Sequence, residues 1–258
     1  MKQLTAGTDA YVKAAVFGLG IFVAAILIIL IAILILSPSD IVFPIILLIP
    51  VILAFLALRF LKRWGLIIAG LLSLFGLFAL TADAGLTLTT PESFFDFILT
   101  LFAIIGLGIC LVACVVGTIQ YFRKQVPSDP SPNITMALRG LAGLAAVLAV
   151  ISLVLTVISA TDTVSADDKE GALELVAEDT KWNTNELEGR SGQPVRIFLK
   201  NDDPILHTFT IKDIDFEKKM GGWSEQIVEI DALEPGVYGF ICAVEGHEED
   251  MTGVLTIR

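Results

Sequence analysis

The sequence contains few of the side chains that usually bind metals or form disulfides. Its 258 residues include two histidines, three cysteines and four methionines. Cys110 and Cys114 lie in an apolar segment, so Cys242 has no partner in the polar C-terminal part, and a disulfide framework is excluded. Neither histidine lies in an apolar segment, which excludes a haem held by two histidines between membrane helices. A lone cysteine in a water-facing domain is inert, a reactive thiol or a metal ligand.

Apolar and acidic residues are segregated along the chain. The composition is 55% hydrophobic, yet the net charge is −11. Residues 1–161 carry six acidic and eight basic side chains, whereas residues 162–258 carry twenty-two acidic and nine basic ones. We therefore expect a membrane region over 1–161, a polar linker over 162–171 and a water-facing domain over 172–258. So acidic a surface argues against nucleic acid as a partner.

The N-terminal region contains apolar stretches long enough for helices that cross a bilayer, which needs about 20 residues per helix. Five such stretches predict five transmembrane helices in contact with lipid: residues 11–36, 41–58, 64–81, 94–121 and 138–160. Lys, Arg, Asp and Glu are absent from the interior of these stretches, which argues against a proton relay or an ion path.

Basic residues between the apolar stretches predict the orientation of the chain. The segments expected on the inside, which include the ends of neighbouring stretches, contain all eight of them: Lys2, Lys13, Arg59, Lys62, Arg63, Arg123, Lys124 and Arg139. The opposite loops contain Asp40, Asp83, Glu92 and Asp96 and no base. Positive loops remain in the cytoplasm, so we expect a cytoplasmic N-terminus. We therefore expect a multi-pass protein of the cell membrane. An odd number of spans places its C-terminal domain on the extracytoplasmic side.

Short segments with alternating apolar residues begin near residue 173. They read "ALELVAE", "VRIFLKN", "LHTFTIK", "EQIVEIDA", "VYGFICA" and "TGVLTIR". Turns rich in Gly, Pro, Asn and Asp separate them. This period of two predicts an all-β sandwich or barrel after the helical bundle, in a multi-domain chain.

The scarce metal-binding side chains gather in this β domain. Cys242, His247 and Met251 fall between two neighbouring predicted strands, and His207 begins a strand after the turn "NDDP". Two imidazoles, one thiolate and a weak thioether are the ligands of a blue-copper site. Zinc is the chief alternative metal, because Cys and His also suit it. A Cys–His hydrolase is a further alternative, although the loop offers no evident orienting group.

The stretches "NDDPILHTFTI" and "YGFICAVEGHEEDMTGVLTIR" resemble the cupredoxins, the group of plastocyanin and azurin. The spacing Cys-x4-His-x3-Met is similar to that of azurin. The resemblance implies a Greek-key sandwich over 172–258 that holds one mononuclear type 1 copper through His207, Cys242, His247 and Met251. It also implies that Thr208 lies beside the thiolate and that His247 is the ligand through which electrons pass.

The expected function is therefore single-electron transfer by a membrane-anchored blue copper protein outside the cytoplasmic membrane, without catalysis. Glu245, Glu248, Glu249 and Asp250 surround His247 in sequence and would attract a basic redox partner such as a c-type cytochrome. A further possibility, compatible with this function, is that the five helices dock on a respiratory or photosynthetic complex. The alternative function is copper storage, delivery or sensing coupled to the membrane helices.

Overall fold

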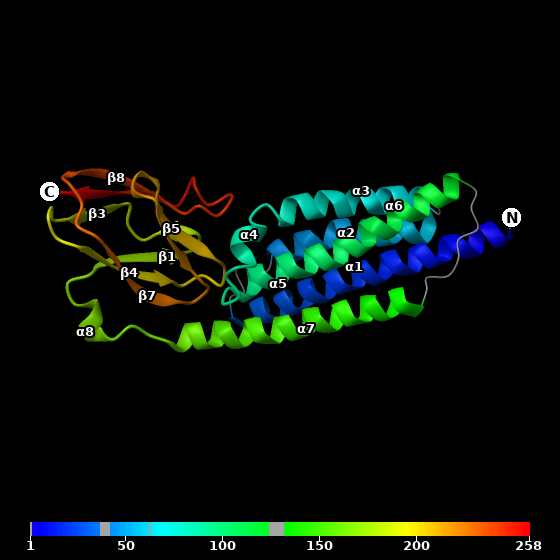
Figure 1. The fold of residues 1–258 in the computed structure, drawn as a ribbon, viewed down its shortest axis with the longest axis horizontal. Coiled ribbons are helices and arrows are strands. Elements are labelled where there is room, and N and C mark those ends of the chain that lie inside the picture. The colour runs from blue at the N-terminus through cyan, green and yellow to red at the C-terminus, as the bar shows by residue number, and fades with distance from the viewer. Residues whose placement is uncertain (1, 37–41, 62, 124–131) are drawn as a thin grey trace. The chain divides into compact units, whose positions relative to one another are not determined.

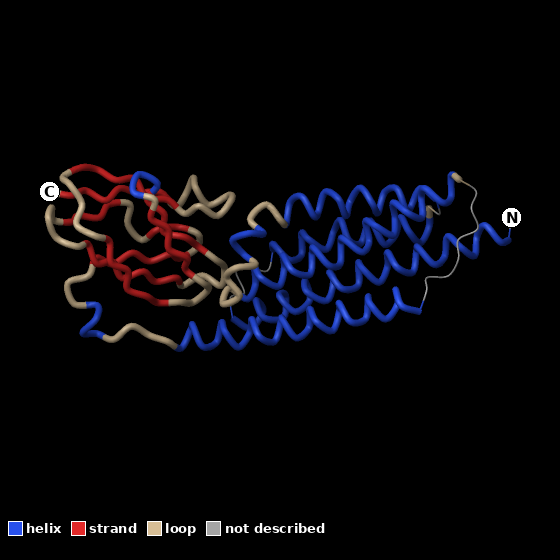
Figure 2. The backbone as a smooth tube through the Cα atoms, viewed as in Figure 1, coloured by secondary structure: helices blue, strands red, loops and turns tan. Residues whose placement is uncertain are grey.

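The computed structural model describes residues 2–36, 42–61, 63–123 and 132–258. Asp40, Lys62 and Lys124, which contribute to the predicted orientation, lie outside these ranges. The chain forms two compact units. The first comprises Met1–Ala84 and Ile98–Leu148, and the second comprises Gly85–Phe97 and Ala149–Arg258. Helices dominate the first unit, and the strands belong to the second (Figure 2).

The first unit is a bundle of apolar helices. They are α1 (Lys2–Leu36), α2 (Val42–Phe60), α3 (Arg63–Leu80), the π-helical turn η2 (Ala103–Leu107) and α6 (Gly108–Phe122), together with parts of α5 (Phe94–Phe102) and α7 (Pro132–Thr161). Gly18 and Gly106 permit close packing of two helices, because a Cβ at Gly106 would lie 2.7 Å from the carbonyl oxygen of Gly18. Small residues of this kind bring membrane helices together.

The apolar helices differ in number and length from the five predicted spans. Three are long and apolar enough to cross a membrane: Ala10–Leu34, Phe94–Phe122 and Met136–Thr161. The predicted spans 41–58 and 64–81 correspond to the shorter helices Pro44–Phe60 and Trp64–Leu80. An α-helix rises about 1.5 Å per residue, so each shorter helix covers about 25 Å of a hydrocarbon layer about 30 Å thick. Among the described residues, length and composition therefore support three full-length spans.

The second unit contains two β-sheets (Figure 1). One has the order β2 (Lys181–Trp182), β1 (Leu173–Glu178), β4 (Val195–Asn201), β7 (Glu225–Ile230). The other has the order β3 (Glu186–Gly189), β9 (Thr252–Ile257), β8 (Gly236–Ile241), β5 (His207–Ile211), β6 (Phe216–Met220). All six strands predicted from alternation are present, whereas β2, β3 and β6 were not predicted.

The core of the sandwich lies between the two sheets. Phe209 and Phe240 are fully buried there, with their ring centroids 5.4 Å apart. Cys242 and Met251 belong to the same buried cluster. The core therefore extends into the loop between β8 and β9, which contains three of the four predicted copper ligands.

The predicted linker contains a short helix, α8 (Ala166–Lys169), that contacts the sandwich. The Ser165 hydroxyl caps this helix by accepting a hydrogen bond from the amide of Asp168. Lys169 forms an ion pair with Glu225 at 2.9 Å and lies over the ring of Phe198. The residues between α7 and β1 are thus fastened to β4 and β7.

The second compact unit is larger than the predicted domain of residues 172–258. It also includes Gly85–Phe97, which contains most of α4 (Ala84–Thr87) and the start of α5. We call residues 85–97 the docking segment. This segment precedes the sandwich by about 75 residues in the sequence and belongs to the same compact unit.

Candidate metal centre

Two neighbouring strands position the first pair of predicted ligands. His207 is the first residue of β5, and Cys242 directly follows β8. The strands are antiparallel, with Thr210 opposite Ile241, so the start of β5 lies at the same end of the sandwich as the end of β8. The amide of Cys242 donates to the carbonyl of Met251 at 2.9 Å, which closes the base of the intervening loop.

The loop between β8 and β9 turns back on itself and brings His247 to the same end. The amide of His247 donates to the carbonyl of Val244 at 3.1 Å, and the amide of Met251 donates to the carbonyl of His247 at 2.9 Å. Gly246 has a φ of +86°, a conformation that glycine adopts without strain. The sequence "EGH" therefore supplies the residue that this turn requires.

Three candidate ligand atoms form a small triangle. The Cys242 sulfur lies 3.8 Å from Nδ1 of His207 and 3.7 Å from Nδ1 of His247. The two Nδ1 atoms are 3.2 Å apart. Among the described residues, these three form the group of His, Cys and carboxylate side chains whose atoms could together hold a metal ion.

The three ligand candidates differ in their access to water. His207 and Cys242 are fully buried, whereas His247 is partly exposed. Met251 is also fully buried, and its backbone bonds to both Cys242 and His247. The fold thus brings Met251 to the loop as the sequence indicated, and its role as a thioether ligand stays a prediction.

Thr208 contacts the sulfur through its backbone and not through its hydroxyl. Its amide donates to the Cys242 sulfur at 3.4 Å. Its hydroxyl oxygen accepts from the amide of Ala243 at 2.7 Å and lies 3.1 Å from the hydroxyl of Thr210. Sequence reasoning expected a polar side chain beside the thiolate. The strand pairing supplies a main-chain donor there instead.

Sequence reasoning missed Asp203, which holds the imidazole of His207. Nε2 of His207 lies 2.8 Å from Oδ2 of Asp203. The carboxylate also accepts hydrogen bonds from the amides of Asp179 and Thr180, at 2.8 and 2.9 Å. A proton on Nε2 leaves Nδ1 free as an acceptor, and a carboxylate in this role orients metal-binding histidines in many proteins. The acidic pair in "NDDP" was the available signal.

The charges at the centre favour a thiolate beside an imidazolium in the metal-free protein. Burial alone would lower the pKa of His207, but hydrogen bonds to Asp203 and Cys242 raise it to about 9. Burial alone would raise the pKa of Cys242, but hydrogen bonds from His207 and His247 lower it to about 6. Burial also opposes ionisation of Asp203, yet its bond to His207 keeps the pKa below the ordinary value.

This pair predicts an unusual pH profile for the metal-free protein. The low pKa of Cys242 adds stability at high pH that is lost as the pH falls from 9 through about 6. The high pKa of His207 adds stability at low pH that is lost as the pH rises from 6.5 through about 9. The two slopes oppose each other, so we expect a nearly flat free energy of unfolding between these limits.

Urea unfolding followed by tryptophan fluorescence would measure this profile. Cys242→Ser removes one of the two slopes. Its stability should therefore fall as the pH rises above 6.5, by on the order of 1 kcal/mol, because Asp203 still raises the pKa of His207 after the contribution of Cys242 is lost. Parallel profiles for the two proteins would contradict the coupling.

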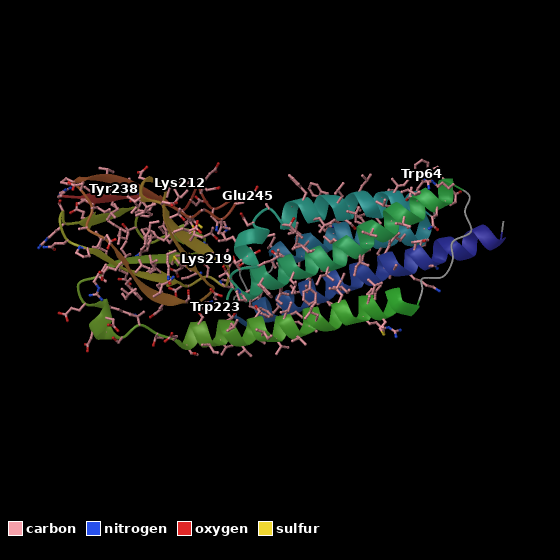
Figure 3. The ribbon with its side chains drawn as sticks, in the orientation of Figure 1. Trp64, Lys212, Lys219, Trp223, Tyr238 and Glu245 are labelled. Atoms are coloured by element: carbon pink, nitrogen blue, oxygen red, sulfur yellow. The ribbon has the colours of Figure 1, made fainter. Side chains whose placement is uncertain are left out.

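Acidic residues follow the metal-binding loop. Glu245, Glu248, Glu249 and Asp250 are all exposed, and they flank the partly exposed His247 in the chain. Figure 3 labels Glu245 in this loop. The imidazole that reaches water is therefore also the one with acidic neighbours.

The chemistry of the centre suits a soft metal ion that changes charge. A thiolate binds Cu(I) well, and imidazoles are good ligands for Cu(II). The main-chain donor from Thr208 and the carboxylate on His207 hold the sulfur and one ring in place before any metal binds. The donor set therefore fits copper, and the full burial of two donors excludes bulk water from that side.

Known proteins are similar to the C-terminal part of this chain. Residues 148–257 match the family model of the cupredoxin-like domain. No curated protein matches the sequence. Reduced auracyanin of Roseiflexus castenholzii is 19% identical and matches over 34% of this chain and 96% of its own, with a TM-score of 0.31.

Two further solved structures are similar to the same extent. Auracyanin A, a blue copper protein of Chloroflexus aurantiacus, is 20% identical over 34% of this chain and 98% of its own, with a TM-score of 0.30. The metal-binding domain of the Cu(I)-exporting ATPase CopA of Streptococcus pneumoniae is 16% identical. It matches over 34% of this chain and 84% of its own, with a TM-score of 0.30. The matched residues and the His–Cys–His group agree with a type 1 copper site, and residues 148–257 form a cupredoxin-like domain.

Proposed function

We propose that this protein is a membrane-anchored blue copper protein that transfers single electrons on the extracytoplasmic side of the membrane. The observation that carries the proposal is the triangle of one thiol sulfur and two Nδ1 atoms, with sides of 3.2 to 3.8 Å. His207, Cys242 and His247 would hold the copper, with Met251 as the weak fourth ligand. The copper would supply a one-electron change of charge.

The residues of the chain prepare this site in separate ways. Asp203 keeps Nε2 of His207 occupied, so that Nδ1 faces the sulfur. Thr208 donates its amide to the sulfur and stabilises the negative charge of the thiolate. His247 is partly exposed, which makes its ring the nearest part of the centre to an external redox partner. A site already held in place changes little between two oxidation states.

The membrane part of the proposal rests on the apolar helices and on the distribution of basic residues. Three described helices are long and apolar enough to cross a bilayer. We propose that the two shorter helices cross as well, with the N-terminus in the cytoplasm, because the loops that follow alternate helices carry the basic residues. The Greek-key connection of the sandwich is part of the same proposal.

Copper titration of the full chain in detergent tests the proposal. One equivalent of Cu(II) should produce an intense visible absorption from the thiolate, which one electron bleaches and reoxidation restores. A chain that binds copper without colour and without reversible reduction would refute electron transfer. Release of Cu(I) within the time of an electron exchange would favour the alternative of copper storage, delivery or sensing.

The exposed acids predict a salt-dependent reaction with basic partners. We propose that Glu245, Glu248, Glu249 and Asp250 attract a cationic redox protein, such as a c-type cytochrome, toward His247. Replacing all four with their amides should slow electron exchange with a basic cytochrome by about tenfold at low salt, because electrostatic steering raises association rates by 10-fold or more. Stopped-flow kinetics would measure the rate.

The control for this prediction is an equal loss of charge elsewhere. Amides at four other exposed acids, in the turns that follow β5 and β7, should leave the rate nearly unchanged: Asp213, Asp215, Asp231 and Glu234. Equal effects of the two sets of substitutions would show that the net charge of −11, and not a docking site, controls the encounter.

A further inference from the structure

The docking segment, residues 85–97, contacts the backbone that carries one of the metal ligands. The amide of Leu206, the residue immediately before His207, donates to Oδ2 of Asp96 at 2.7 Å. The hydroxyl of Ser93 donates to the same carboxylate oxygen at 2.8 Å and is fully buried. Ser93 thus holds the Asp96 side chain in place. Asp96 in turn accepts the hydrogen bond from the backbone amide just before the ligand His207.

The contact with the sandwich extends beyond this one bond. The rings of Phe95 and Trp223 meet edge to face, with centroids 5.7 Å apart (Figure 3 labels Trp223). Gly221 lies so close to Glu92 that an added Cβ would be 2.9 Å from its Cγ atom. The turn between β6 and β7 therefore has a glycine where the docking segment passes.

The docking segment is also fixed on its other sides. Ser152 and Thr156 of α7 donate their hydroxyls to the carbonyls of Pro91 and Glu92, each at 2.6 Å. Lys219 of β6 donates to the hydroxyl of Thr89 at 2.7 Å. Two elements that are distant in sequence, α7 and β6, thus also hold the segment.

We propose that the docking segment is a built-in part of the metal centre and that Asp96 is a positioning residue for His207. Asp96 fixes the Leu206–His207 backbone at one end of the imidazole, and Asp203 fixes Nε2 at the other. The proposal deepens the proposed function and rests on it. In this arrangement the docking segment occupies the side of the centre that carries Leu206 and Trp223. External partners would then reach the centre at the partly exposed His247.

The test compares Asp96→Ala with Asp96→Asn in the full chain in detergent. Alanine removes the acceptor for Leu206, whereas asparagine keeps an acceptor oxygen of the same shape. In the metal-free protein, hydrogen exchange of the Leu206 amide should become about tenfold faster with alanine and stay near the wild-type rate with asparagine. Competition with a Cu(I) chelator should show about tenfold weaker binding for alanine, restored by asparagine.

The matched control is Asp231→Asn, because Asp231 follows β7 at the end of that strand away from Trp223. This substitution should change neither measurement. If the alanine variant does not fold, Ser93→Ala removes the other bond to Asp96 Oδ2 and should produce smaller changes in the same direction. Wild-type exchange and affinity in Asp96→Ala would overturn the inference. A wild-type chain that binds no copper would refute the proposed function instead, while the exchange measurement would still test the bond between Asp96 and Leu206.

Discussion

Cys242→Ser is expected to abolish the visible absorption and the reversible reduction of the copper-loaded protein. A serine hydroxyl is not a soft ligand and cannot give the intense thiolate absorption. The loss of copper affinity should exceed the 10- to 100-fold that is typical of residues that only support a ligand, because a ligand itself is removed. Visible spectra, voltammetry and competition with a Cu(I) chelator measure these losses.

The chain offers matched controls for this substitution. Cys110 and Cys114 are the other two cysteines, both are buried in α6, and their sulfurs lie 4.0 Å apart. Serine at either position should leave the colour and potential of the centre unchanged. Loss of colour in Cys110→Ser or Cys114→Ser, with colour retained in Cys242→Ser, would place the copper in the helical bundle and refute the proposed site.

Asp203→Ala is the substitution with the next largest expected effect. It removes the acceptor for Nε2 of His207 and leaves the amides of Asp179 and Thr180 without their partner. We expect copper affinity to fall by about 10- to 100-fold, as for other carboxylates that orient a metal-binding histidine. In the metal-free protein, the pKa of His207 should fall, because Asp203 is a main cause of its elevation.

Asp202→Ala is the neighbouring control. Asp202 forms an exposed ion pair with Lys200 at 2.9 Å and does not bond to His207 in the structure. Exposed pairs contribute little to stability, so affinity should stay within about twofold of wild type. NMR titration of the two histidines would follow the change in pKa. An unchanged His207 titration in Asp203→Ala would show that the 2.8 Å contact does not control the charge of the ring.

The strands that sequence could predict have apolar residues at alternate positions. β1 does so because one of its faces lies on the core, whereas in β5 and β4 the polar residues between the apolar ones are largely buried as well. β6 reads "FEKKM", in which charged residues occupy consecutive positions, and β2 has two residues. Strands of these kinds form by pairing with a neighbour, as β6 does with β5, and their own residues carry little pattern.

The metal-binding residues could be inferred because histidine and cysteine are scarce and chemically distinctive. The groups that support them could not. Asp203 is one of many acids in an acidic domain, and only the fold directs its carboxylate to His207. Asp96 lies 110 residues before Leu206, in a stretch that reads as the start of an apolar helix. A pairing at that separation leaves no local pattern in a single sequence.

The contacts of residues 85–97 have a consequence for the order in which the protein matures. The ribosome makes Asp96 110 residues before its partner Leu206, and before the whole of α7 and the whole sandwich. Contacts between distant residues form slowly, because a long stretch of chain must first be ordered. The contacts of the docking segment therefore cannot form until the sandwich has been synthesised. A sandwich excised at residue 162 would lack Phe95 and leave Trp223 without that contact.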